Sequence, residues 1–223
     1  MSLRACLASL LFATLAIANT EKAIFVAPPP TVTPDAGPTF DDLHLDSLSP
    51  DQLSLRLSLP VAFPSEAEPQ GLDSWYLLEG LSEGQRYEVR TCWAAVQPTA
   101  FTIDTFNIMH VFDTSSLITS LADFSESRAQ QPPLETKQRS GARQGSILFL
   151  RIQSGADYHT TNETLMRHPP PVDVDIILDP YLANVFPQSL VPTAGYITVL
   201  AAGSWFLSGA IWNRVFSAKQ HSD

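Results

Sequence analysis

The chain has 223 residues, with 13 Lys and Arg against 23 Asp and Glu, and its formal net charge at pH 7 is −10. An acidic surface repels phosphate backbones, so nucleic acid is excluded as a partner. Two cysteines are present, and Cys6 lies in an N-terminal segment that is expected to be removed. Cys92 then has no internal disulfide partner; it is expected to be a small buried hydrophobe, with an intermolecular bridge as the alternative.

Residues 1–18 have the pattern of a signal peptide. Arg4 precedes a charge-free run from Ala5 to Ala18, which is shorter than the roughly 20 apolar residues needed to span a bilayer. The run ends in Ala16-Ile-Ala, the small-x-small pattern that signal peptidase accepts, so cleavage after Ala18 is predicted. The alternatives are an uncleaved anchor and a buried N-terminal helix.

Residues 19–188 are predicted to form a luminal domain that is mainly β, an immunoglobulin or fibronectin III-like β-sandwich with one short helix. Strands are expected where apolar or β-branched residues alternate or cluster, at 24–27, 53–59, 99–111, 147–153 and 172–178 and at both ends of 75–93. Alternation places one set of leucines on a single strand face: Leu53, Leu55, Leu57 and Leu59.

One helix is expected directly after the N-cap candidates Asp113, Thr114 and Ser115. Apolar residues then recur at helical spacing at Leu117, Ile118, Leu121 and Phe124. The following segment, 130–145, is rich in Gln, Pro, Arg and Gly and is predicted to be a mobile loop.

The segment 75–93 reads as a strand, a turn at 81–84 and a second strand. Tyr87 follows the turn glycine Gly84 by three residues, the placement that makes a tyrosine corner in β-sandwiches. In that structure the ring packs in the core and the hydroxyl bonds backbone a few residues upstream. Gly84 fits a turn with positive φ. The alternative is an ordinary hairpin with an exposed tyrosine.

Few residues offer chemistry. Asn162-Glu-Thr is an N-glycosylation sequon, so Asn162 is predicted to be glycosylated in the lumen. Asp173 and Asp175 match the two-carboxylate pattern with which some sugar transferases hold a metal-bound nucleotide sugar, but strand alternation places both on the solvent side. The histidines show no metal-ligand spacing, and no nucleophile elbow or phosphate loop occurs. A chain without catalytic residues, cofactor or metal is therefore favoured.

The C-terminal part has the composition of a membrane span. No charged residue occurs between Asp179 and Arg214, and 191–213 is long enough to cross a bilayer. Tyr196 and Trp212 lie near its ends, where aromatic rings favour the headgroup region. The basic residues after the span predict a cytosolic tail at 214–223 and a single-pass type I orientation. A buried core helix and a GPI-attachment signal are the alternatives.

Two short features lie within the span and the tail. Gly203, Ser204 and Ser208 are small residues at a spacing that lets a second helix approach closely, the alternative being ordinary small-residue content. Lys219 and His221 are similar to basic retrieval signals of type I proteins of the endoplasmic reticulum. The alternative is a simple stop-transfer flank.

The stretch W-Y-L-L…G-Q-R-Y-E-V-R-x-C-W at 75–93, with 61–64 and 111–114, resembles a fungal family of small endoplasmic-reticulum co-activators of GPI mannosyltransferase II. The resemblance extends from about Ile24 to the membrane helix. It implies a non-catalytic subunit in the endoplasmic reticulum membrane, and its partner would be the polytopic GPI mannosyltransferase catalytic subunit that adds the second mannose to GPI precursors. No catalytic residue carries over from the family. A luminal cargo receptor or chaperone-like adaptor is the alternative function, and a luminal sugar-modifying enzyme is a third.

Overall fold

The computed structural model describes residues 19–30, 40–129 and 145–220. The predicted signal peptide at 1–18, residues 130–144 of the loop predicted at 130–145, and His221 lie outside this part of the chain. The bounds that follow are those of the described residues.

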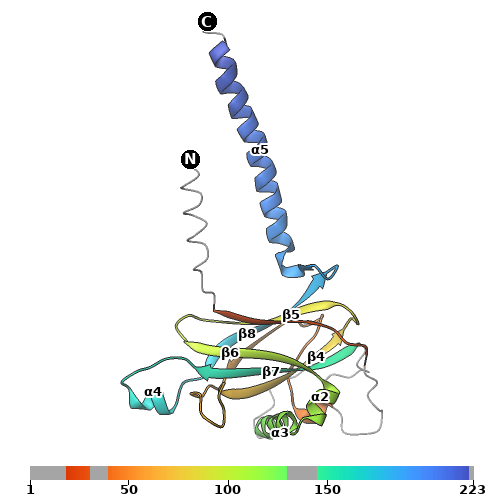
Figure 1. Cartoon of the computed structure of the whole chain (residues 1–223), viewed down its shortest axis with the longest axis vertical. Coiled ribbons are helices and arrows are strands. Elements are labelled where there is room, and N and C mark those ends of the chain that lie inside the picture. The colour runs from red at the N-terminus through yellow and green to blue at the C-terminus, as the bar shows by residue number, and fades with distance from the viewer. Residues whose placement is uncertain (1–18, 31–39, 130–144, 221–223) are drawn as a thin grey trace.

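Two β-sheets form the folded domain (Figure 1). The first sheet has the strand order β1-β5-β8-β3, with β9 added on β8; its strands are β1 Thr20–Val26, β5 Arg86–Trp93, β8 Val172–Leu182, β3 Ser54–Leu59 and β9 Phe186–Pro187. The second sheet has the order β2-β4-β7-β6, with β2 Ser47–Leu48, β4 Leu72–Leu81, β7 Ser146–Ala156 and β6 Thr99–Asn107. The pair β2–β4 is parallel, and the other neighbours are antiparallel.

The main core lies between the two sheets, where alternate residues of facing strands meet. The buried set includes Tyr87 and Val89 from β5, Ile176 from β8, and Leu148 and Leu150 from β7. Strand alternation thus works as the sequence predicted, because every second side chain of a strand points to the same face. The four leucines predicted to share one face of β3 are buried to different extents. Leu59 is buried, Leu55 and Leu57 are half-buried, and Leu53, which precedes the strand, is exposed.

Helices α2 (Ile108–Asp113) and α3 (Ser115–Ala129) cover the other face of the second sheet. A second apolar cluster lies between them and the sheet; it contains Leu45, Trp75, Leu77, Ile108, Val111, Leu117, Leu121, Ile147 and Phe149. Strands β4 and β7 are therefore buried on both faces. This explains why they read as nearly continuous apolar runs and do not alternate.

The mainly β class and the helix over Leu117 to Phe124 are confirmed, and two details were wrong. The strand predicted at 99–111 ends at Asn107, and the chain continues as α2 because Ile108 and Val111, three residues apart, both pack on the sheet. Further short helices are present: η1 Phe40–Leu43, α4 Glu163–Arg167 and η2 Gln188–Leu190. The immunoglobulin or fibronectin III comparison stays a prediction.

Helix α5 (Val191–Gln220) leaves the domain and projects away from it on the side of β1, β5 and β8 (Figure 1). The segment Gln188–Arg214 is long and apolar enough to cross a membrane, and its most apolar stretch has no residue buried inside the protein. A buried core helix is therefore the wrong alternative. Its apolar side chains require a cover of lipid or of another protein.

Candidate functional site at the root of the C-terminal helix

The turn between β4 and β5 crosses from one sheet to the other, so the segment 75–93 is not a hairpin. Gly84 has φ +73°, and no atom lies near the position a Cβ would take. The buried Tyr87 hydroxyl accepts a hydrogen bond from the Ser82 backbone N–H at 3.1 Å and donates one to Gln85 Oε1 at 2.9 Å. A hydroxyl bonded to backbone a few residues upstream is the geometry of a tyrosine corner.

This corner is tied to the turn that follows β8. Ala183 and Asn184 adopt φ values of 50° and 58°, a left-handed conformation that asparagine tolerates better than most residues. The Asn184 side chain accepts a hydrogen bond from the Arg86 N–H at 2.8 Å and donates one to the Gly84 carbonyl at 2.8 Å. Gln85 Nε2 also donates to the carbonyl of Tyr181, one residue before the end of β8, at 3.3 Å. The corner therefore fixes the backbone that leads into α5.

A buried charged cluster lies beside this turn, on the outer face of the first sheet. Glu88 and Asp179 are only 4% and 3% exposed. Arg90 Nη1 lies 3.3 Å from the Glu88 carboxylate and 3.4 Å from the Asp179 carboxylate, and Lys22 Nζ lies 3.2 Å from Glu88. Tyr181 donates to Glu88 at 3.3 Å, and its burial, followed by the Glu88 charge, raises the pKa of Tyr181. Two acids are thus neutralised by two bases, as buried charges require.

Ser189 connects this cluster to α5. Its backbone N–H donates to Asp179 Oδ1 at 3.1 Å, and its hydroxyl donates to the other oxygen of the same carboxylate. Arg90 Nη2 reaches the Ser189 hydroxyl at 3.5 Å. Because Ser189 precedes the first residue of α5 by two positions, the helix begins at a point fixed to the sheet. This arrangement can transmit the orientation of the helix to the domain.

Sequence reasoning missed most of this junction. It identified Gly84 and Tyr87, but not Asn184, Asp179 or Ser189. One signal was present, because Asp179 is the last charge before the apolar segment and follows the apolar run Ile176-Ile-Leu178 at an outward-facing position of its strand. A charge at such a position calls for a partner when the strand is buried.

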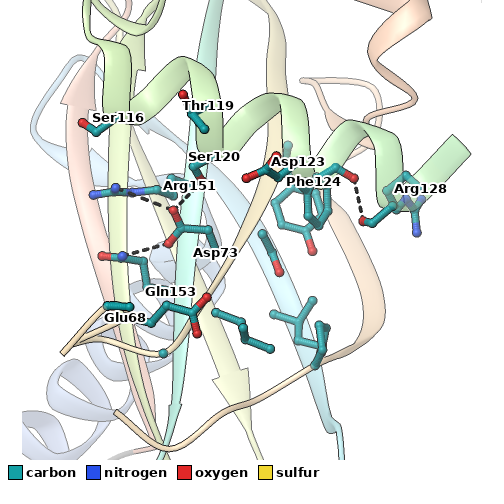
Figure 2. Close-up of a pocket in the computed structure, with 18 of the residues that line it drawn as sticks. Glu68, Asp73, Ser116, Thr119, Ser120, Asp123, Phe124, Arg128, Arg151 and Gln153 are labelled. Carbon is teal, nitrogen blue, oxygen red and sulfur yellow. Dashed lines mark hydrogen bonds and ion pairs between the residues drawn. The ribbon is translucent and has the colours of Figure 1, made fainter. Parts of the chain in front are cut away.

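A polar pocket lies on the opposite side of the molecule, between α3 and the first half of β4 (Figure 2). Its volume is about 850 Å³. Asp73 points into it and accepts hydrogen bonds from Ser120 and from Gln153 Nε2 at 2.8 Å. Ser120 in turn accepts a bond from Trp75 Nε1 at 2.9 Å. Asp73 thereby holds α3 onto the sheet.

The two cations that line this pocket are also paired. Arg151 Nη2 lies 2.7 Å from Asp104, and Arg128 Nη2 lies 2.6 Å from Asp46. The Arg151 guanidinium also lies over the Phe106 ring, 5.2 Å from its centroid. These ion pairs contribute to the packing of α3 and β7, so both cations that line the pocket are already engaged within the protein.

Asn162 is exposed at the start of α4, far from α5 (Figure 1), and its Oδ1 accepts a hydrogen bond from the Thr164 N–H at 3.0 Å. An exposed sequon is accessible to the enzyme that glycosylates it. Cys92 is free and partly exposed, not buried as expected, and its sulfur lies 3.7 Å from Thr20 Oγ1.

Asp173 and Asp175 lie on the outer face of β8, as alternation predicted, while Val172 and Val174 point to the core. Arg56 on β3 contacts Asp175 through two hydrogen bonds of 2.7 Å, and this contact lowers the pKa of Asp175. Within the described residues, no three His, Cys, Asp or Glu side chains are grouped so that they could hold a metal ion.

The small residues of α5 form an open surface. A Cβ added at Gly203 would meet no atom within 4 Å apart from the helix itself, and Ser204 and Ser208 are exposed. The predicted partner-helix face remains a prediction. Lys219 lies in the last turn of α5.

No family model and no solved structure matches the chain. Over 194 residues it is 23% identical to a GPI mannosyltransferase 2 subunit of Schizosaccharomyces pombe, an alignment that covers 84% of this chain and 82% of that protein. The chain is similar to a GPI mannosyltransferase subunit. This confirms the resemblance found in the sequence.

Proposed function

We propose that this protein is a non-catalytic accessory subunit that stabilises or activates a multi-span GPI mannosyltransferase, the enzyme that adds the second mannose in GPI-anchor biosynthesis. The observation that carries the proposal is the similarity to a GPI mannosyltransferase 2 subunit over most of both chains. The relative supports a place in a mannosyltransferase complex, and the accessory role within that complex is our inference.

The proposed topology is single-pass type I in the endoplasmic reticulum membrane. Cleavage after Ala18 leaves an immunoglobulin or fibronectin III-like domain in the lumen, where Asn162 is glycosylated. Helix α5 spans the bilayer, and the basic residues that follow it, including Lys219 and His221 as a retrieval signal, lie in the cytosol. The exposed apolar surface of α5 supports this arrangement, since such a surface is stable in lipid.

An accessory role agrees with how the polar groups of the domain are used. Two of the carboxylates considered for chemistry are bonded within the protein, Asp73 to Ser120 and Gln153, and Asp175 to Arg56. A general acid or base must instead reach the reacting atoms of a substrate. Chemistry is therefore assigned to the multi-span partner.

The proposed contact with the partner is the small-residue face of α5. Helix pairs in membranes associate where small side chains let the backbones approach, because lipid provides no hydrophobic driving force between helices. A rigid root then fixes how the luminal domain lies beside the partner. The fixed contact between Ser189 and Asp179 supports this second step.

Co-purification of the tagged full-length chain in mild detergent tests the proposal. The wild-type chain is expected to recover a multi-span mannosyltransferase, and the double variant Ser204→Leu/Ser208→Leu is expected to lose it. Ala202→Leu is the matched control, because it adds a leucine at the same depth on another face of the helix. Recovery of soluble secreted cargo in place of a multi-span protein would instead support the cargo-receptor alternative.

A further inference from the structure

We infer that the outer face of the first sheet lies against the luminal surface of the lipid bilayer. This inference rests on the proposed spanning of the membrane by α5 and not on the proposed mannosyltransferase partner. The surface concerned, called here the membrane-facing patch, consists of the exposed residues Ile24, Val26, Val185 and Leu190.

The length of the apolar segment sets the depth of the root of α5. The 27 residues from Gln188 to Arg214 extend over roughly 40 Å as a helix, whereas the hydrocarbon core is about 30 Å thick. About 5 Å of the segment therefore extends beyond the hydrocarbon at each end. Ser189, at the luminal end, is placed among the lipid headgroups.

The sheet follows Ser189 to that depth because no flexible linker separates them. The Ser189 N–H lies 3.1 Å from the Asp179 carboxylate, and Asn184 anchors the preceding turn to the corner. Asp179 is opposite Glu88 across β8 and β5, and Glu88 is opposite Ile24 across β5 and β1. With neighbouring strands about 4.8 Å apart, Ile24 lies about 10 Å across the sheet from the anchored strand. Figure 1 shows this sheet extending beneath the end of α5, roughly across the helix axis.

The chemistry of the face fits an interface with lipid. Ile24 and Val26 are 52% and 54% exposed on the outward side of β1, and Val185 at the turn beside α5 is 78% exposed. The acids beside the root of α5, Glu88 and Asp179, are buried and paired, so they do not oppose approach to headgroups there. Further along the same face of β8, Asp175 is paired with Arg56, and the exposed Asp173 lies six residues from Asp179. Aliphatic side chains in the interface gain free energy roughly in proportion to the area removed from water.

This placement orients the whole domain. Helices α2 and α3 and the polar pocket lie on the opposite side of the sandwich from α5, so they face the lumen, away from the bilayer (Figure 1). A luminal part of a partner would reach that side freely.

The test uses full-length chains in which Cys92 is replaced by Ser and one new cysteine carries an environment-sensitive fluorophore. Labels are placed at Ile24→Cys and Val185→Cys in the patch and at Leu200→Cys inside α5. The matched control is Met109→Cys on α2, which is 65% exposed on the opposite side of the domain. Each chain is reconstituted alone into phosphatidylcholine liposomes with or without lipids that carry a spin label on the headgroup or on the acyl chain.

The fluorophores at positions 24 and 185 are expected to lose more than half of their intensity to headgroup spin labels, and the fluorophore at 109 to lose almost none. The fluorophore at 200 should be quenched by acyl-chain spin labels, which shows that α5 is inserted. Quenching at 200 without quenching at 24 and 185 would overturn the inference, and so would the absence of quenching at 200. Because no partner is present, a failed co-purification leaves this result unaffected.

Discussion

The tyrosine corner gives the sharpest stability prediction, because a single oxygen can be removed from it without changing its packing. In Tyr87→Phe the ring keeps its stacked contact with Phe25, with centroids 5.8 Å apart. The Ser82 N–H loses its acceptor and Gln85 loses a donor. An unsatisfied, partly buried donor costs about 1 to 3 kcal/mol, so the free energy of unfolding should fall by about 2 kcal/mol.

For a domain of this size, about 2 kcal/mol corresponds to a fall in Tm of roughly 4 to 8 °C. The Tm of the full chain in detergent is measured by thermal unfolding, with near-ultraviolet circular dichroism as the signal. Tyr158→Phe is the matched control, because its hydroxyl donates to the Leu165 carbonyl at 3.0 Å in an exposed region. That loss should cost less than about 1 kcal/mol. Equal and small shifts for the two variants would refute the assigned role of the corner.

Three further predictions concern other parts of the domain. Gly84→Ala should lower the free energy of unfolding by about 1 to 2 kcal/mol, because of the positive φ alone. Gly71→Ala should lower it further, since the new Cβ would lie 2.1 Å from a backbone oxygen of β7. Denaturant titrations of both variants measure the difference. The lowered pKa of Asp175 beside Arg56 stabilises the folded state above about pH 4, and this contribution is lost as the pH falls through the lowered pKa. The Tm of the wild type should therefore fall slightly more between neutral and acidic pH than the Tm of Asp175→Asn. Identical profiles of Tm against pH for the two proteins would contradict this prediction. Asn162→Gln should abolish a glycosidase-sensitive shift in gel mobility, and a shift that persists would place the glycan elsewhere.

The sequence allowed the elements with a strong period or a long apolar run to be predicted. Strand β8 was found because the residues at Val172, Val174 and Ile176 alternate with polar ones, and α5 was found because no charge interrupts it. Helix α2 was missed because it continues a β-branched and aromatic stretch, and its only helical signal is the pair Ile108 and Val111.

The junction could not be predicted because its contacts join distant parts of the chain. The Asn184 side chain bonds the backbone of Arg86, 98 positions earlier, and Arg90 bonds Ser189, 99 positions later. Local patterns carry no information about such pairs; strand order decides them. Gly84 and Tyr87 were identifiable since a corner is encoded within a few residues.

Analysis of GPI precursors after depletion of this chain tests the central claim most directly. If the protein supports the transfer of the second mannose, depleted cells should accumulate precursors that carry one mannose, and expression of the full-length chain should remove them. Precursors and mature anchors that remain normal, together with delayed secretion of a subset of proteins, would contradict the account.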